Sequence, residues 1–126
     1  MINIVAIAAG GATGAVLRHF FNSGIILATG AAFPLGILVI NVLGSFLMGA
    51  MAGVFAHVYE PPQAMKLFLS VGVLGGFTTF SAFSLDAVLL WERGEIVQSL
   101  AYVLCSVVFS IVALVAGLFL VRVLSA

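Results

Sequence analysis

Charge is what this sequence has least of. Asp, Glu, Lys and Arg together make up 6% of its 126 residues, whereas a typical soluble domain carries about 25%. So few charges cannot cover the surface of a soluble protein of this size, and 64% of the residues are hydrophobic. The composition therefore predicts an integral membrane protein.

Other absences exclude several classes of function. A single cysteine, Cys105, allows neither an intramolecular disulfide nor a thiolate metal cluster. The formal net charge is +0 and the basic residues do not cluster, which argues against nucleic acid as a partner. No basic residue precedes the first apolar run, so we expect no cleavable signal peptide. Without a soluble domain, any function is expected to lie within the bilayer.

Four apolar runs of about 20 residues are long enough to cross a membrane. They cover roughly residues 4–21, 35–57, 65–91 and 96–121. The segment NSG is predicted to end the first run, two prolines separate the second from the third, and Gly94 ends the third. No internal repeat or linker occurs. The sequence therefore predicts one all-α domain, residues 1–126, with four transmembrane helices.

The Lys and Arg residues divide evenly between the two sides of this topology. Lys66 and Arg122 fall on the side of both termini, and Arg18 and Arg93 fall on the other. Membrane orientation normally follows an excess of Lys and Arg in the cytoplasmic loops, so two interpretations are open. Either other signals orient the chain, or copies insert both ways up and pair as an antiparallel, dual-topology homodimer.

Glycines four residues apart occur in three of the four runs. Such GxxxG pairs let helix backbones approach closely in lipid. They serve either a contact between two subunits or packing within one. The pairs are Gly10 with Gly14, Gly49 with Gly53, and Gly72 with Gly76.

The third run contains an unusually polar stretch, LGGFTTFSAFSLD. As one continuous helix the run would extend roughly 40 Å, beyond the hydrocarbon core, which tilt can absorb. The alternative is a break at Gly75, Gly76, Thr78 and Thr79, buried in protein or lining a cavity because free peptide groups cannot face lipid. In transporters, such breaks coordinate Na⁺ through carbonyl groups and attract anions to half-helix N-termini.

Aromatic and hydroxyl side chains surround this predicted break. Phe80 and Phe83 are three residues apart and share a helix face, and the positive edge of a phenyl ring favours a small anion. Alone, each polar residue is explained by an interhelical hydrogen bond. Together with a broken helix, they favour a pathway. The polar residues concerned are Asn41, Ser45, Ser81, Ser84, Ser99, Tyr102, Ser106 and Ser110.

Charged residues lie near the ends of the predicted spans. Arg18 either extends to the membrane interface or marks a vestibule that concentrates anions. Asp86 lies about one turn before the end of the third span, within reach of a cation, a polar pocket or water. His19 and His57 are too far apart in the predicted topology to suggest a metal site.

The chain resembles the small bacterial fluoride channels of the CrcB or Fluc family over essentially its whole length. The resemblance rests on GGATGAVLR in the first span, PLGILVINVLGSFLMG in the second, GGFTTFSAFS in the third and the Tyr102, Ser106 and Ser110 stripe in the fourth. The third-span motif is the most specific of the four.

The resemblance implies a multi-pass protein of the bacterial inner membrane that conducts fluoride passively. It implies an antiparallel homodimer in lipid, with two pores and a central structural Na⁺ but no organic cofactor. Asp86 departs from the family in replacing an expected Glu, and His19 replaces an expected aromatic residue. The residues that match family positions are Asn41, Phe80 and Phe83 along the fluoride pathway, Tyr102, Ser106 and Ser110 beside it, Arg18 at the vestibule, and Gly75 and Thr78 as Na⁺ ligands through their backbone carbonyls in both subunits.

Two rival functions come from other classes. A small dual-topology, proton-coupled multidrug exporter needs a titratable group near the midplane, usually a carboxylate. The first span has none, and Asp86 lies towards a helix end. A non-transporting membrane subunit held together by its glycine pairs leaves the polar stripe and the break unexplained. A passive channel makes no bond, so we expect no enzymatic activity.

Overall fold

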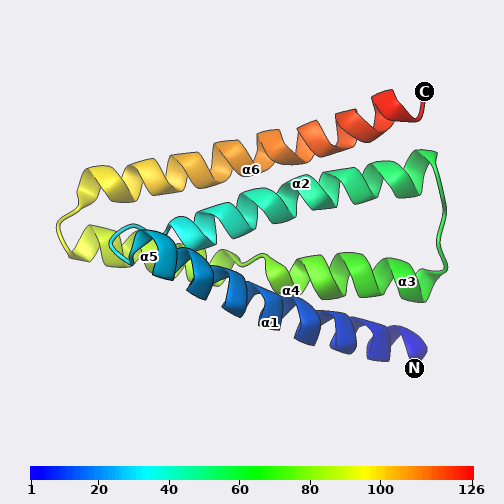
Figure 1. Cartoon of the computed structure of the whole chain (residues 1–126), viewed down its shortest axis with the longest axis horizontal. Coiled ribbons are helices and arrows are strands. Elements are labelled where there is room, and N and C mark those ends of the chain that lie inside the picture. Colours follow the sequence, from blue (N-terminus) through cyan, green and yellow to red (C-terminus); the bar gives the residue numbers. More distant parts are fainter.

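The computed structural model describes all residues, 1–126, and is entirely helical (Figure 1). Four helical segments are long and apolar enough to cross a membrane, and the third of these is interrupted. The prediction of an all-α, multi-pass membrane protein with a broken third helix is therefore confirmed. The elements are α1 (Ile2–Thr29), α2 (Leu35–His57), α3 (Gln63–Leu67), the π-helix η1 (Phe68–Leu74), α4 (Gly75–Phe77), α5 (Phe80–Glu92) and α6 (Ile96–Leu124).

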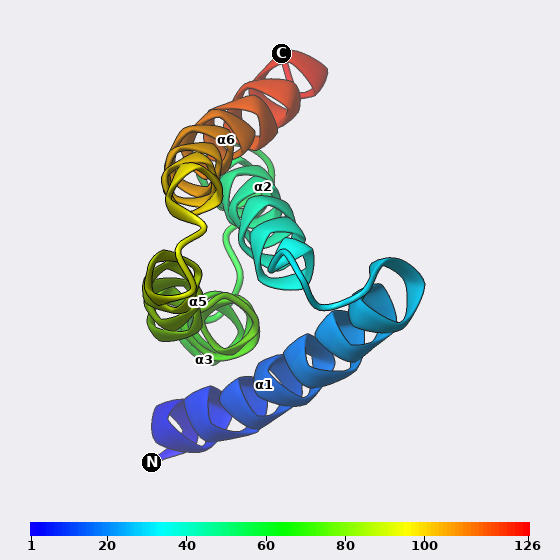
Figure 2. The ribbon, with the colours of Figure 1, turned by 90° about the vertical axis from the view of Figure 1, so that its left-hand side faces the viewer.

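The helices form two packed groups. Helices α2 and α6 run side by side, and α1 packs against the half of the third span that contains α3, η1 and α4 (Figures 1 and 2). Both termini and the α2–α3 connection lie at one end of the molecule, and the α1–α2 and α5–α6 connections lie at the other (Figure 1).

Glycines allow the close approach of α2 and α6. A side chain at Gly49 would meet the backbone of Leu114, and one at Gly117 would stand 2.8 Å from the amide nitrogen of Ala50. Gly53 lies against the side chain of Val121. Close packing replaces the hydrophobic drive that is missing between helices in lipid. The Gly49–Gly53 pair therefore serves packing within the protomer.

The other two glycine pairs join α1 to the third span. A methyl group on Gly72 would stand only 2.8 Å from the Cα atom of Gly10, so the two backbones are in direct contact. Gly14 lies against the backbone of Val73, and Gly76 lies against that of Gly11. The second of the two interpretations left open by the sequence, packing within one subunit, therefore holds for all three pairs.

The first helix is longer than the sequence suggested. The NSG segment at 22–24 does not end it, and α1 continues to Thr29 before Gly30 adopts a left-handed φ of 86°. Ser and Gly are tolerated inside membrane helices, so only a residue with a non-helical backbone stops this one. As a result, Arg18 lies well inside α1 and not near its end.

The break in the third span involves two residues. Thr78 (φ −81°, ψ 158°) and Thr79 (φ −153°, ψ 122°) are extended, which separates α4 from α5. The prediction that Gly75 and Gly76 also belong to the break is wrong, because both lie in α4 and Gly75 has helical dihedral angles (φ −63°, ψ −38°). Gly76 packs closely against the backbone of Gly11, whereas Gly75 is exposed. The widened π-helical turns of η1 lead into the short helix α4, which ends at the break.

The placement of Arg18 changes the balance of basic residues. Lys66 and Arg122 lie at the end that carries both termini, and Arg93 lies at the opposite end (Figure 1). The interfaces therefore carry two basic side chains against one, while the fourth is inside the span. Lys66 also forms an ion pair with Glu60, so the orienting charge difference is very small.

Candidate functional site

Asn41 holds the break from the neighbouring helix α2. Its side-chain Oδ1 accepts a hydrogen bond from the Thr79 amide nitrogen at 2.8 Å, and its Nδ2 donates to the Thr79 carbonyl oxygen at 3.0 Å. Both peptide groups of an extended residue are thus satisfied by one side-chain amide. Unpaired peptide groups at this depth would cost several kcal/mol each. By pairing both groups, Asn41 stabilises the break within a membrane span.

Thr79 begins the second half of the span. Its Oγ1 accepts a hydrogen bond from the Ala82 amide nitrogen at 3.1 Å, which is a standard N-cap contact. The Ser81 hydroxyl lies 3.3 Å from the same oxygen. The N-terminus of α5, with its partial positive charge, therefore starts at the break.

Arg18 reaches the same break from α1. Its Nη1 donates to the carbonyl oxygen of Thr78 at 3.1 Å, and this contact is partly buried. The ion pairs of the molecule are Lys66 with Glu60 and Arg93 with Glu95, so no carboxylate neutralises Arg18. The break therefore carries a fixed positive charge in addition to the helix N-terminus.

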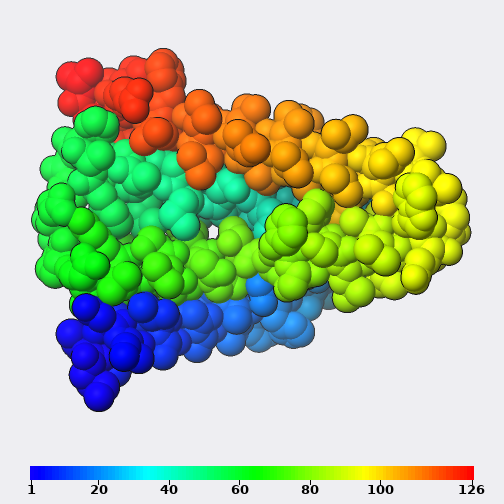
Figure 3. Space-filling model, turned by 180° about the vertical axis from the view of Figure 1, so that it is seen from behind, coloured from blue at the N-terminus to red at the C-terminus, as the bar shows by residue number.

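A groove of about 390 Å³ opens beside the break. It is bounded by α2, α5 and α6, and Figure 3 shows the face hollowed where the third span and α6 diverge over α2. Phe80, at the edge of the groove, is 76% exposed. The lining residues are Asn41, Gly44, Ser45, Met48, Thr78, Thr79, Phe80, Phe83, Ser106, Val107, Ser110, Ile111 and Leu114.

The Ser106 hydroxyl is the one buried side-chain polar atom without a hydrogen-bond partner. A serine in a membrane helix commonly bonds back to the carbonyl four residues earlier, yet Ser106 does not, although it lines the groove. A buried donor left free costs about 1–3 kcal/mol. Such a group in a cavity indicates a ligand or water that completes it.

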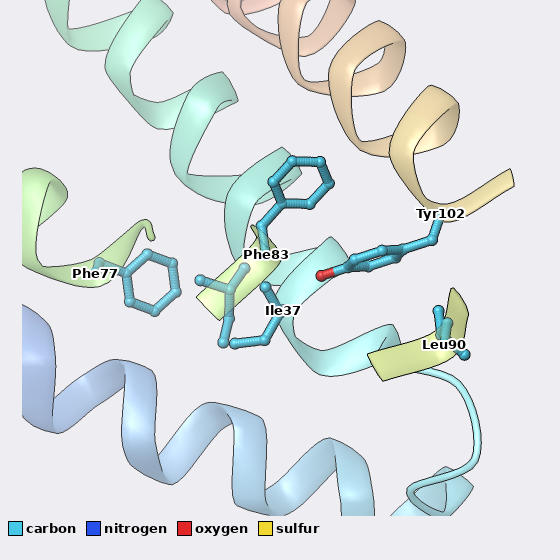
Figure 4. Close-up of a cluster of buried hydrophobic side chains, with 6 residues drawn as sticks. Ile37, Phe77, Phe83, Leu90 and Tyr102 are labelled. Atoms are coloured by element: carbon cyan, nitrogen blue, oxygen red, sulfur yellow. The ribbon is translucent and has the colours of Figure 1, made fainter. Parts of the chain in front are cut away.

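An aromatic row leads from the groove into the core. The ring centroids of Phe80 and Phe83 are 5.3 Å apart, and those of Phe83 and Tyr102 are also 5.3 Å apart. Figure 4 shows Phe83 and Tyr102 beside Ile37 in the buried cluster. Tyr102 is fully buried. These three rings form one continuous row from the groove edge on α5 to the buried core beside α6.

Two hydroxyl groups beside this row of rings are already paired. The Tyr102 hydroxyl donates to Oδ2 of Asp86 at 3.4 Å, so the half-buried Asp86 side chain faces α6. The Ser99 hydroxyl donates to the Ala87 carbonyl oxygen at 2.8 Å, which makes Ser99 a contact between α5 and α6. Of the predicted hydroxyl stripe, Ser106 and Ser110 face the groove.

The structure brings together only part of the predicted pathway. Asn41, Phe80, Phe83, Ser106 and Ser110 line one groove. Ser81, Ser84 and Tyr102 lie outside its lining. The Ser84 hydroxyl donates to the Phe80 carbonyl oxygen at 2.9 Å within its own helix.

One role and two residues at the site were not predicted from the sequence. Thr79 was predicted to lie in the break, but not to cap α5; the signal for the cap was a threonine just before an apolar helical run. Gly44 lies against the Thr78 methyl group, so a small residue is needed there. Phe33, in the α1–α2 connection, packs its ring on Tyr102, and no local pattern marks it.

Taken together, four membrane-capable helices, a break within the third span, an open groove and an unneutralised arginine define an integral membrane protein with a polar, positively charged site inside its spans. Comparison with known proteins identifies the family of this chain. A sequence profile described as "CrcB-like protein, Camphor Resistance (CrcB)" matches residues 5–118, so this chain belongs to the CrcB family.

Named relatives cover nearly the full length. The chain is 50% identical over 121 residues to the "Fluoride-specific ion channel FluC 1" of Nitrobacter hamburgensis, covering 96% of each chain. It is 51% identical over 119 residues to the "Fluoride-specific ion channel FluC" of Rhodospirillum centenum, covering 94% of each. A relative of that name from Rhizobium meliloti is 48% identical over 122 residues, with 97% of this chain and 98% of the relative covered.

Proposed function

We propose that this protein is a fluoride-selective channel through which fluoride leaves the cell passively. The choice of fluoride as the ion rests on the relatives named as fluoride-specific channels. The single observation that carries the proposal is the unpartnered Ser106 hydroxyl, buried in the wall of a groove that Phe80 and Phe83 also line. It is a free donor placed beside aromatic rings.

The proposed mechanism replaces water around fluoride with fixed groups. Fluoride is strongly hydrated, so a pathway must offer hydrogen-bond donors and positive ring edges in a preformed arrangement. Ser106 and Ser110 supply hydroxyl donors on one wall. The N-terminus of α5 and the Arg18 guanidinium add positive potential at the break.

The same groove supports a homodimer. It is open on one face, and Phe80 beside it is 76% exposed. Gly75, next to the break, is exposed, and the Thr79 amide that would bond to its carbonyl in a continuous helix bonds to Asn41 instead. This carbonyl would face lipid unless protein covers it, which lipid-exposed spans do not allow. A second copy inserted in the opposite sense closes both grooves at once and produces two pathways, one per protomer face.

A central Na⁺ between two protomers fits the exposed break. The Thr79 amide, which would bond to the Gly75 carbonyl in a continuous helix, bonds to Asn41 instead, and Gly75 is exposed. The Thr78 carbonyl accepts from Arg18 with one lone pair. Gly75 and Thr78 of both copies would hold the ion, and neutral carbonyl oxygens suit a hard cation. When bound, the ion supplies positive charge at the interface.

The channel interpretation requires no chemical step, so the protein is proposed not to be an enzyme. A proton-coupled exporter is not favoured. Its titratable carboxylate should be free at the midplane, whereas Asp86 is held by Tyr102 in the second half of the third span.

The first prediction tests conduction and the role of Ser106. Purified protein in liposomes loaded with fluoride should release it rapidly once a potassium ionophore dissipates the membrane potential, as measured with a fluoride electrode. Ser106→Ala removes the free donor and should slow release by about 10- to 100-fold, the value of a hydrogen bond to a charged group.

Thr13→Ala is the matched control, because the Thr13 hydroxyl is exposed and bonds to the Ala9 carbonyl of its own helix. It should release fluoride as the unmodified protein does. Release from protein-containing vesicles at the rate of empty vesicles would contradict the channel. Wild-type release from the Ser106→Ala variant would refute the role of the hydroxyl alone.

The second prediction concerns orientation. With Lys66 and Arg122 at one end and Arg93 at the other, the charge difference is too small to orient every copy. Fusions of alkaline phosphatase and of a green fluorescent protein to the C-terminus should therefore both be active. Adding two lysines after Ala126 should suppress the phosphatase signal. Activity of one reporter only in the unmodified chain would exclude dual topology.

A further inference from the structure

The aromatic row does not end at Tyr102. Phe33, from the connection between α1 and α2, packs edge-to-face on Tyr102, with ring centroids 5.6 Å apart and planes at 89°. Four rings thus follow one another from the groove to the end of the molecule: Phe80, Phe83, Tyr102 and Phe33. Three are on membrane helices, and the fourth is on a loop.

The loop that carries Phe33 is anchored from the opposite connection. Arg93, at the end of α5, donates from Nη2 to the Ala32 carbonyl oxygen at 3.0 Å and to Glu95 Oε2 at 3.0 Å. Ala32 directly precedes Phe33, and Pro34 follows it. The position of the ring is therefore set by a contact between the two connections at this end of the protein.

We propose that Phe33 is a positioning and specificity-determining residue of the ion pathway, which acts by holding Tyr102 and, through it, Phe83. This inference rests on the proposed fluoride conduction. Phe33 itself lies outside the lining of the groove, whereas Phe83 lines it and is only 8% exposed. The effect of Phe33 is transmitted by ring contacts.

Tyr102 is enclosed by an aromatic ring on each side. Its ring is fully buried between Phe83 and Phe33, and its hydroxyl is directed to Asp86. Without the Phe33 ring, one side of Tyr102 loses its packing surface and the ring gains freedom. Phe83 then loses a fixed neighbour. A small anion needs ring edges at a fixed separation. If the Phe83 ring can move, the pathway also admits a larger halide.

The test compares fluoride and chloride release from liposomes that contain wild-type protein or variants. Phe33→Leu keeps an apolar side chain but removes the ring. It should slow fluoride release by about 3- to 10-fold, the size of one lost ring–ring contact, and raise the ratio of chloride to fluoride release. Phe33→Tyr keeps the ring and should behave as wild type. Phe109→Leu, an exposed ring on α6 outside the row, is the matched control.

Each outcome decides between the two proposals. Absence of fluoride release from wild-type vesicles would reject the proposed function. Wild-type conduction with unchanged rate and ratio in Phe33→Leu, or an equal loss in Phe33→Tyr, would reject the role of Phe33 alone. If Phe33→Leu does not fold, Arg93→Lys, which keeps the charge at this end but removes the guanidinium group that bonds to the Ala32 carbonyl, carries the test. An increased chloride ratio supports the inference, and an unchanged ratio overturns it.

Discussion

Replacing Asn41 by alanine is expected to abolish fluoride release and to lower the stability of the protein. The substitution leaves both the amide and the carbonyl of Thr79 without the partners they have at 2.8 and 3.0 Å. Each unpaired buried group costs about 1–3 kcal/mol, so the folded state should lose about 2–6 kcal/mol in total. Release from vesicles should fall to the level of empty liposomes.

A second substitution at the same position separates its two bonds. Asn41→Asp retains an acceptor for the Thr79 amide but loses the donor to the Thr79 carbonyl, and it introduces a negative charge at the groove. It should therefore remain better folded than Asn41→Ala while conducting no fluoride. Stability is followed by the fluorescence of Trp91 during heating in detergent. Asn3→Ala, at an exposed position, is the control. Wild-type melting and conduction in Asn41→Ala would refute the role of this side chain.

The four spans could be predicted because length and apolarity alone determine what crosses a bilayer. The break was predictable for a related reason. A polar stretch with two threonines inside an apolar span is expected only at a site that protein covers. Both features depend on composition over many residues, so they do not require knowledge of which side chains meet.

The exact extent of each element was harder to predict. The NSG segment resembles a helix stop, but Ser and Gly remain helical in α1, where Gly30 provides the actual stop. Gly75 and Gly76 are equally able to adopt helical or extended backbone. A contact that spacing does not reveal holds Gly76, which packs against the backbone of Gly11 and stays helical.

Contacts between helices could not be predicted from residue spacing. Asn41 was expected to face a pathway, and it does line the groove while also binding both peptide groups of Thr79. That pairing depends on the rotation of α2 relative to the break. Phe33 lies in a loop without periodicity, so its contact with Tyr102 is visible only once the connections are placed.

Arg18 is the residue whose role changes most with its position. The sequence placed it near a helix end, where an arginine side chain extends easily into water. In the structure it lies within α1 and donates to the Thr78 carbonyl at the break. A unit charge within about 10 Å of a second one contributes about 1–2 kcal/mol at an effective dielectric constant of 20. One unneutralised guanidinium can therefore change anion occupancy by about 10-fold.

Two substitutions separate the charge of Arg18 from its hydrogen bond. Arg18→Gln keeps amide donors directed towards the Thr78 carbonyl but removes the charge. It should remain folded, conduct fluoride about 10-fold more slowly, and lose the steep decline of conduction with ionic strength that screening of a fixed charge produces. Arg18→Met removes both functions and should also lower the melting temperature, because it leaves a partly buried carbonyl without its donor.

Arg122→Gln provides the control, because Arg122 is an exposed cation in the last turn of α6. Its removal changes the net charge by the same amount without touching the break, so conduction and melting should match wild type. If Arg18→Gln and Arg122→Gln conduct equally, the charge at the break does not assist the anion. The guanidinium would then serve only as a backbone cap, and the attraction for anions would have to come from the N-terminus of α5 and the hydroxyls of the groove.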